Sequence, residues 1–460
     1  MQGTSGCAWT YACTPVDLAA EKRLRRRTKT NGHDPAATPD KQPFWKRFGP
    51  GLITGASDDD PSGIATYSQA GARFGFQLAW TLLLTYPLMV VIQAISARIG
   101  RTTGKGIAGN LREHYPNWLL QSTVGLLFAA NTLNIGADLG AMGEATRLLL
   151  PAIPVWLYVI VYALICTAGQ VFCNYAHYVM VLKWLTLSLF AYVATLFVVH
   201  VPWGKFALGL VWPRFTFDRD LWMTVVAILG TTISPYLFFW QAAQEVEDTK
   251  ANVDEQPLRE KPAQGTKALA RIRLDTVVGM GFSNFVALAI MVTAATTLHA
   301  AGIREVESAA QAAEALQPIA GNFAFGLFAL GIVGTGLLSV PVLAGSAAYA
   351  LGEARRWPVG LARQPLQAKA FYAAITVATF VGAGATMVSL NPVTALVWAA
   401  VINGIVAVPV MALLMVMAAD RRVMGRFCIS RTWKVIGWLA TASMAIAAVA
   451  FIAISVTQSK

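Results

Sequence analysis

Residues 49–65 read Gly-Pro-Gly-Leu-Ile-Thr-Gly-Ala-Ser-Asp-Asp-Asp-Pro-Ser-Gly-Ile-Ala. Three carboxylates, Asp58, Asp59 and Asp60, therefore stand in the middle of an apolar run, where charge is costly in hydrocarbon. Pro61 and Gly63 follow at once and disfavour an uninterrupted helix. The stretch predicts a helix that unwinds here, which frees backbone carbonyls beside the charge of Asp60.

A second interruption lies five predicted spans later. Residues 230–236 read Gly-Thr-Thr-Ile-Ser-Pro-Tyr, again small polar residues and a proline inside an apolar run. Corresponding breaks in spans one and six are what an inverted repeat of five helices produces, with a site between the halves. A cation suits such a site, because carbonyls at a half-helix end carry the negative end of the dipole and Asp60 adds a formal charge.

A simpler interpretation is that Pro61 and Pro235 only kink two packed helices, with the aspartates at an aqueous vestibule. That interpretation would suffice for one proline in one span. Two breaks in register with a repeat, one of them carrying aspartates, favour the ion-binding site.

Composition places the whole chain in a membrane. Of its 460 residues, 56% are hydrophobic and 13% are charged, a balance foreign to soluble proteins of this length. We expect an all-α polytopic membrane protein with about eleven transmembrane helices of roughly 20 residues or more. The expected spans are 49–74, 77–99, 118–147, 152–172, 177–201, 221–243, 274–298, 322–350, 369–389, 392–418 and 432–456. Repeat one would cover about 49–201 and repeat two about 221–418, with 432–456 as an extra helix.

The net charge of +12 reports topology and not a nucleic-acid partner, because the basic residues cluster in alternate loops. These loops and the basic tail of residues 1–45, which has no signal-peptide core, are expected to be cytoplasmic and the tail disordered. With an odd number of spans the amino terminus is cytoplasmic and the carboxyl terminus extracytoplasmic, in a bacterial-type inner (plasma) membrane. The transporter domain then covers residues 46–460.

Several motifs in a fixed order resemble the NRAMP family of divalent metal transporters. Besides the two breaks they are Ala137-Asp138-Leu139-Gly140, the glycine-rich eighth span around Leu343-Ala344-Gly345, and Asp420-Arg421-Arg422-Val423-Met424-Gly425. The resemblance covers most of the chain after the tail. It implies the LeuT-like inverted 5+5 repeat with discontinuous helices 1 and 6, alternating access, and a divalent metal ion as substrate.

Two departures from the family pattern bear on the metal. The family's Asp-Pro-Gly-Asn is here Asp60-Pro61-Ser62-Gly63, and its Met-Pro-His is Ser234-Pro235-Tyr236. Loss of the methionine thioether favours hard ions, and loss of the asparagine enlarges the site for an ion that retains water, as magnesium does. We therefore expect a metal site of Asp60, Gly63, Thr231 and Ser234, similar to the NRAMP-related magnesium transporters, with manganese as a competitor.

Coupling to protons is expected to be weak or absent. Tyr236 and Gln241 stand where proton-coupled members carry histidines, and neither titrates near neutral pH. Asp59 and Asp138 are intramembrane carboxylates of the cavity, and Asp138 could neutralise the cation or relay a proton. Asn403 could offer an oxygen ligand to the ion or form a hydrogen bond between helices. Asn131, Asn134 and Asn284 are expected to form such interhelical hydrogen bonds.

Four other acidic residues are weaker candidates for the site. Glu144 is expected near the outer end of span three, turned away from Asp138. Glu245, Glu247 and Asp248 follow span six and are expected in a solvated loop, with an attraction of cations to an inward cavity as the weaker alternative.

Three further functions compete. They are a broad-range proton-coupled transition-metal transporter, a carrier of an amino acid or amine on the same fold, and an intramembrane enzyme using Asp60 and Asp138. The aspartates beside the break disfavour an anionic substrate, and no zinc or Ser/His motif lies in the spans, so no enzyme is expected. No cofactor or nucleic acid is expected, only the metal substrate and the lipid bilayer, and the oligomeric state stays open.

Overall fold

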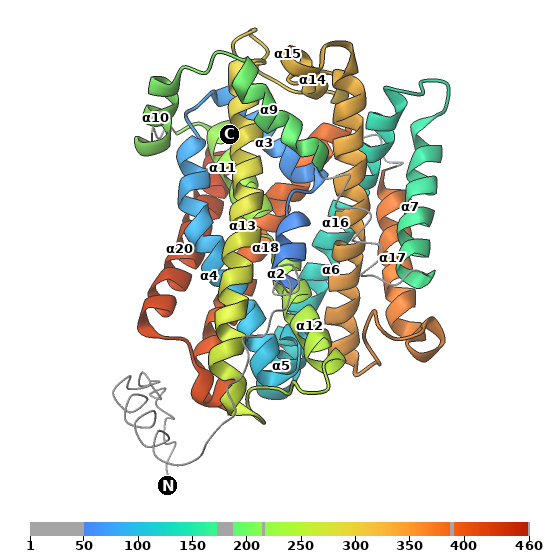
Figure 1. Ribbon diagram of the computed structural model, residues 1–460, viewed down its shortest axis with the longest axis vertical. Helices are drawn as coiled ribbons and strands as arrows, with labels where there is room; N and C mark the ends of the chain where they lie inside the picture. The colour runs from blue at the N-terminus through green and yellow to red at the C-terminus, as the bar shows by residue number, and fades with distance from the viewer. Residues whose placement is uncertain (1–49, 173–186, 214–216, 387–390, 459–460) are drawn as a thin grey trace, which may run out of the picture.

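The structure is a computed structural model that describes residues 50–172, 187–213, 217–386 and 391–458. The described residues form helices and connections only, and the long helices run side by side along the long axis of the molecule (Figure 1). The first half contains α2 (Pro50–Ala56), α3 (Pro61–Phe74), α4 (Ala79–Thr103), α5 (Ile107–His114), α6 (Asn117–Arg147), α7 (Val155–Phe172), α9 (Phe190–Val198) and α10 (Trp203–Val211). The second half contains α11 (Arg219–Thr232), α12 (Pro235–Ala251), α13 (Gly265–Thr296), α14 (Ala309–Glu314), α15 (Gln317–Ala320), α16 (Ala324–Arg355), α17 (Lys369–Ala385), α18 (Pro392–Ala419), α19 (Arg421–Met424) and α20 (Arg431–Gln458).

The bundle presents an apolar surface to lipid. Within the described ranges, seven helical segments are long and apolar enough to cross a membrane. Large apolar side chains are exposed on outer helices, among them Trp156 and Leu164 of α7 and Ile446 and Val449 of α20. The protein is an integral membrane protein with several spans.

Both predicted helix breaks are present. The first span is divided into α2 and α3 by residues 57–60, and the sixth into α11 and α12 by Ile233 and Ser234. Pro61 and Pro235 each occupy the first turn of the helix that follows, where the missing N–H of proline has no intrahelical partner to lose. The prolines therefore start new helices, so the interpretation that they only kink continuous ones is wrong.

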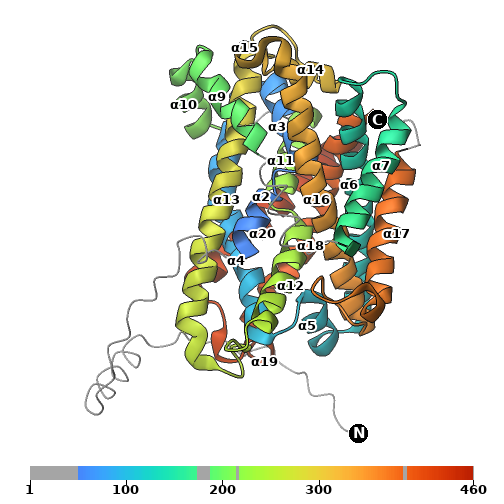
Figure 2. The same cartoon turned by 45° about the vertical axis from the view of Figure 1, so that its right-hand side comes forward.

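The unbroken helix α13 lies along both halves of the first span (Figure 2). Close approach is possible because glycines face it: a Cβ on Gly55 would lie 2.3 Å from the backbone carbonyl of Gly279, and one on Gly71 would lie 2.2 Å from the carbonyl oxygen of Met291. Near the start of α2, Asp275 of α13 accepts a hydrogen bond from the N–H of Gly51 at 2.7 Å. Helix α13 thus holds the two short helices in line across their break.

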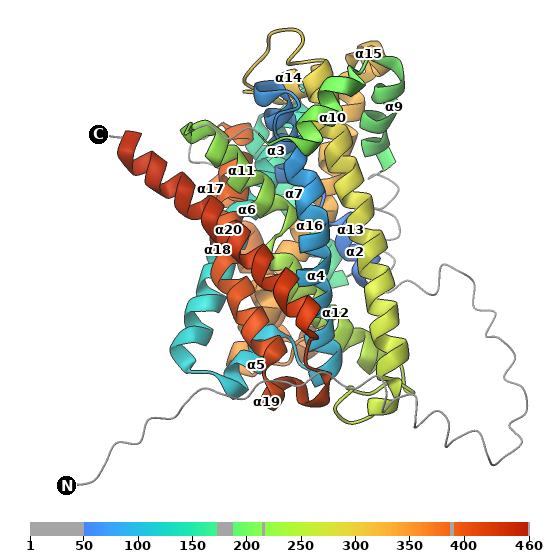
Figure 3. The same cartoon turned by 90° about the vertical axis from the view of Figure 1, so that its left-hand side faces the viewer.

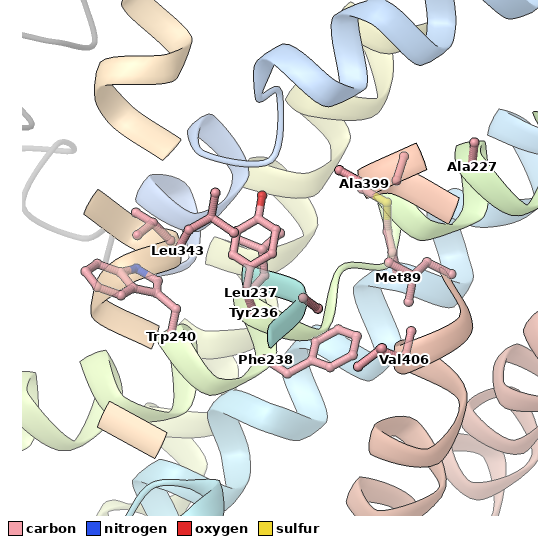
Figure 4. Packing of buried hydrophobic residues seen from close by; sticks show 14 of the residues in the cluster. Met89, Ala227, Tyr236, Leu237, Phe238, Trp240, Leu343, Ala399 and Val406 are labelled. Atoms are coloured by element: carbon pink, nitrogen blue, oxygen red, sulfur yellow. The ribbon is translucent and has the colours of Figure 1, made fainter. Parts of the chain in front are cut away.

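Aromatic side chains of α12 pack tightly next to the second break. Tyr236, Phe238 and Trp240 of α12 are buried and pack among residues such as Met89 of α4 and Val406 of α18 (Figure 4). Because the first turns of α12 are buried on all sides, the helix start is fixed in position.

The basic loops, which carry arginines in residues 98–112, 259–273, 355–363 and 421–431, meet at one end of the bundle. Arg101 donates to the carbonyl of Gln256, Arg112 to that of Glu353, and Arg259 to that of Val423. These contacts join the loop after α4, the end of α16, the loop after α12 and helix α19, as the alternation of charge predicts.

The boundaries around span six differ from the sequence prediction. Helix α12 runs on to Ala251 and α13 already begins at Gly265, so Glu245, Glu247 and Asp248 are helical and the expectation of a solvated loop was wrong. Glu245 is fully buried and pairs with Arg271 of α13 at 2.6 Å. A buried pair across two helices compensates charges that a loop would have left to water.

The fifth span is described only in part. Residues 173–186 lie outside the described part of the chain, and the rest of the expected 177–201 span forms a 3-10 turn and α9. Helix α10, which the sequence did not predict, follows as a mostly exposed segment.

Candidate metal site

Asp60 is the N-cap of α3 and lies in the first break. Its Oδ1 accepts hydrogen bonds from the N–H of Gly63 at 2.8 Å and from Oγ of Ser62 at 2.7 Å. Its Oδ2 accepts from Nδ2 of Asn134 at 3.1 Å, and the side chain is 1% exposed. Three donors thus orient a buried carboxylate, as a preformed anionic ligand requires.

Asn134 is a site residue that the sequence reasoning assigned to ordinary helix packing. Besides Asp60, it contacts Asn403 of α18, whose Nδ2 lies 3.5 Å from Oδ1 of Asn134. The Oδ1 of Asn403 is buried and makes no hydrogen bond with the described residues. The spacing could have identified Asn134, because it lies one helical turn before Asp138 on the same face of α6.

Asp138 itself is fully buried near the same break. Its Oδ2 accepts from Oγ of Ser339 of α16 at 3.0 Å, while its Oδ1 has no partner among the described residues. It lies one helical turn after Asn134, which donates to Asp60, on the same face of α6. The structure therefore brings together two of the predicted intramembrane carboxylates.

Asp58 and Asp59 share one hydroxyl. Oγ of Ser283 lies 2.6 Å from Oδ2 of Asp58 and 3.0 Å from Oδ1 of Asp59. Both aspartates are at most 3% exposed, which excludes the aqueous vestibule. Since Ser283 belongs to α13, the same helix that packs on α2 and α3 also holds the residues of the break.

The second break faces the first. Tyr236 donates its hydroxyl to the carbonyl of Ser57 at 3.3 Å. A Cβ on Gly63 would lie 3.1 Å from Oγ1 of Thr231, which is buried and has no hydrogen-bond partner among the described residues. Gly63 contributes an N–H to Asp60 and space beside Thr231, and it has no side chain to act as a ligand.

Ser234 and Gln241 are engaged elsewhere. Oγ of Ser234 donates to the carbonyls of Gly230 and Thr231 at 2.8 and 2.9 Å, so its proton satisfies the end of α11 and its oxygen remains an acceptor. Gln241 bonds Gln93 of α4 at 2.7 Å and Thr276 of α13 at 3.4 Å. Gln241 thus links three helices and forms no hydrogen bond with Asp60.

Two cavities lie toward opposite ends of the bundle. One of about 210 Å³ is lined by Ile64 and Ala65 of α3 and by Glu144, in the last helical turns of α6 as predicted. The other, of about 580 Å³, lies at the basic-loop end and is lined by Glu247 and Glu353. The aspartates between them are nearly inaccessible, as in a transporter closed to both sides.

An ion bound between the two helix breaks would be coordinated by oxygen atoms from several kinds of group. Within the described ranges no group of three or more His, Cys, Asp or Glu side chains is arranged to hold a metal. The groups gathered at the breaks are carboxylates, hydroxyls, side-chain amides and carbonyls, which are hard ligands.

Comparisons with known proteins show the family and the fold of the chain. The family model for natural resistance-associated macrophage protein-like (Nramp) proteins matches residues 51–454. The chain belongs to the Nramp family. It is therefore a divalent metal cation transporter and not an enzyme.

The Nramp relatives are distant. The divalent metal cation transporter MntH of Yersinia enterocolitica is 27% identical over 64% of this chain and 69% of its own length, and that of Ralstonia nicotianae 29% identical over 65% and 68%. The crystal structure of the Eremococcus coleocola manganese transporter with an aromatic bis-isothiourea compound superposes with a TM-score of 0.71 at 17% identity, covering 91% of this chain and 88% of that one. Mhp1, a nucleobase-cation-symport-1 family transporter, has a TM-score of 0.59 at 14% identity, covering 89% and 93%. These structures confirm the all-helical Nramp and LeuT-like fold.

Proposed function

We propose that this Nramp transporter carries a hard divalent cation, magnesium with manganese as a competitor, by alternating access with weak or no coupling to protons. The observation that carries the proposal is the buried Asp60 carboxylate, oriented by Ser62, Gly63 and Asn134 in the break between α2 and α3. Asp60 supplies the formal charge that holds the ion.

The oxygen groups around Asp60 support a hard ion. Oγ1 of Thr231 is buried and has no hydrogen-bond partner in the described part of the chain, and Ser234 offers a hydroxyl oxygen where the family has a methionine thioether. The space left by Gly63 next to Thr231 suits an ion that retains part of its water shell, because magnesium loses water reluctantly.

The neutral groups of α12 support weak coupling. Tyr236 is bonded to Ser57, and Gln241 to Gln93 and Thr276, so both act as hydrogen-bonding links between helices. A proton path through them would need a group that titrates near neutral pH.

The proposal includes the orientation and the repeats. The clustered basic loops support a cytoplasmic basic-loop end, which places the amino terminus in the cytoplasm of a bacterial-type cell and the end of α20 outside. Repeats of about 49–201 and 221–418 meet at the two breaks, and cavities at either end would open in turn.

Ion uptake into proteoliposomes tests the proposal. We expect magnesium uptake that manganese inhibits strongly and cadmium inhibits poorly. Asp60→Ala should lose this uptake, while gel filtration shows that the variant is folded. Ser234→Met should raise inhibition by cadmium relative to manganese, because it adds a soft ligand. Tight binding of cadmium to the unmodified protein would contradict the hard site.

A second candidate is a proton-coupled transition-metal transporter, and the Eremococcus coleocola protein of similar fold, a manganese transporter, makes manganese the ion to test. A pH dye inside the same proteoliposomes separates the two. Acidification of the lumen in step with manganese uptake would support this second candidate and contradict weak coupling.

A further inference from the structure

A small pocket lies on the flank of the bundle near the basic loops, away from the helix breaks. It has a volume of about 260 Å³ and is lined by Ala94 and Arg98 of α4, Ile272 and Arg273 of α13, and Trp433 of α20. Helix α4 lies between α13 and α20, and the pocket is where the last turns of α4 meet the first turns of the other two (Figure 3).

Arg98 brings a positive charge that no acid in the described ranges balances. Its Nε donates to the carbonyl of Phe427 at 3.0 Å and its Nη2 to that of Cys428 at 3.1 Å. Both acceptors are neutral, and Arg98 forms no ion pair with a described residue. A guanidinium has five N–H groups, so Arg98 keeps donors for an anion in the pocket.

Arg273 adds a second positive charge, in contrast to its neighbour Arg271. Two residues along α13 correspond to a turn of about 200°, so the two side chains leave the helix on opposite faces. Arg271 is paired with Glu245 at 2.6 Å and Asp248 at 3.6 Å. Arg273 lines the pocket and has no ion pair within the described part of the chain.

The surroundings of the pocket are those of a membrane interface. Its remaining walls are apolar, and Trp433 is the kind of side chain that lies at headgroup level. Directly beside the pocket on the same helices, Leu274 of α13 and Val435 of α20 are 53% and 60% exposed, as expected for apolar side chains that face lipid. An anion held by the two arginines can therefore extend its apolar part along these helices.

We propose that this pocket binds the phosphate headgroup of an anionic phospholipid. Arg98 and Arg273 hold the phosphate, Trp433 packs at the level of the glycerol, and the acyl chains follow α13 and α20 into the bilayer. Clustered basic side chains between transmembrane helices are suited to such headgroups. The site is independent of the transported ion.

Lipid-dependent thermal stability of the detergent-purified full chain tests the site. We expect phosphatidylglycerol to raise the midpoint of unfolding more than phosphatidylcholine with the same acyl chains, and this difference should shrink with salt. Arg273→Gln should weaken the apparent affinity for phosphatidylglycerol about fivefold, and Arg273→Lys should restore most of it. Arg355→Gln, which removes an exposed charge from the end of α16, is the matched control and should leave the affinity unchanged.

Three results would overturn the proposal. One is equal stabilisation by the two lipids, and another is an unchanged affinity in Arg273→Gln. The third is protection by glycerol 3-phosphate, at equal phosphate concentration, as strong as that by phosphatidylglycerol, which would assign the pocket to a free phosphate. Arg273 is exposed and makes no hydrogen bond with a described residue, so its replacement leaves the fold intact.

Discussion

Replacement of Asp60 by asparagine should abolish ion binding and leave the empty protein about as stable as before. Asparagine caps a helix as well as aspartate does, so the start of α3 is retained. The Oδ1 of asparagine still accepts from Gly63 and Ser62, at a loss of about 1 kcal/mol each without the charge, whereas its Nδ2 cannot accept from Nδ2 of Asn134, so that hydrogen bond is lost. Removal of a carboxylate that is 1% exposed relieves a desolvation penalty of several kcal/mol. The opposing effects should leave the free energy of unfolding within about 2 kcal/mol of its original value.

Thermal unfolding with increasing magnesium measures both parts of this prediction. The unmodified protein should gain about 2.7 kcal/mol at an ion concentration of a hundred times Kd, whereas Asp60→Asn should gain nothing. Asp420→Asn is the control, because Asp420 caps α19 in the same way, far from the breaks. A variant that unfolds without ion, or that retains the magnesium-dependent gain, would refute the reasoning.

Further substitutions test the packing around the site. Gly55→Ala should destabilise the protein by about 1–3 kcal/mol and weaken ion binding, because its methyl group collides with the backbone of α13; Gly125→Ala, with open space around it, should be neutral or stabilising. Glu245→Ala should cost about 3 kcal/mol, since it leaves a mostly buried arginine without its nearest partner, whereas Glu113→Ala, at an exposed pair, should cost less than about 1 kcal/mol. Unfolding in mixed detergent micelles measures all four, and equal effects within either pair would contradict the argument.

Local composition was enough to place the breaks. Asp58 to Asp60 followed by Pro61, and Ser234 followed by Pro235, interrupt apolar runs, and no uninterrupted transmembrane helix accommodates such a cluster. The lengths of the other apolar runs predicted a helical bundle and the positions of most helices, because the thickness of the hydrocarbon layer sets the length of a transmembrane helix.

Contacts between helices distant in sequence could not be predicted in this way. Whether Asn134 donates to Asp60 or to an ordinary packing partner depends on where α6 lies relative to α3, a distance of 74 residues along the chain. The burial of Glu245 depends likewise on Arg271 meeting it across two helices. Polarity and hydrophobic length are properties of a segment and can be seen in the sequence, whereas the partner of a buried polar group is decided only when the helices pack.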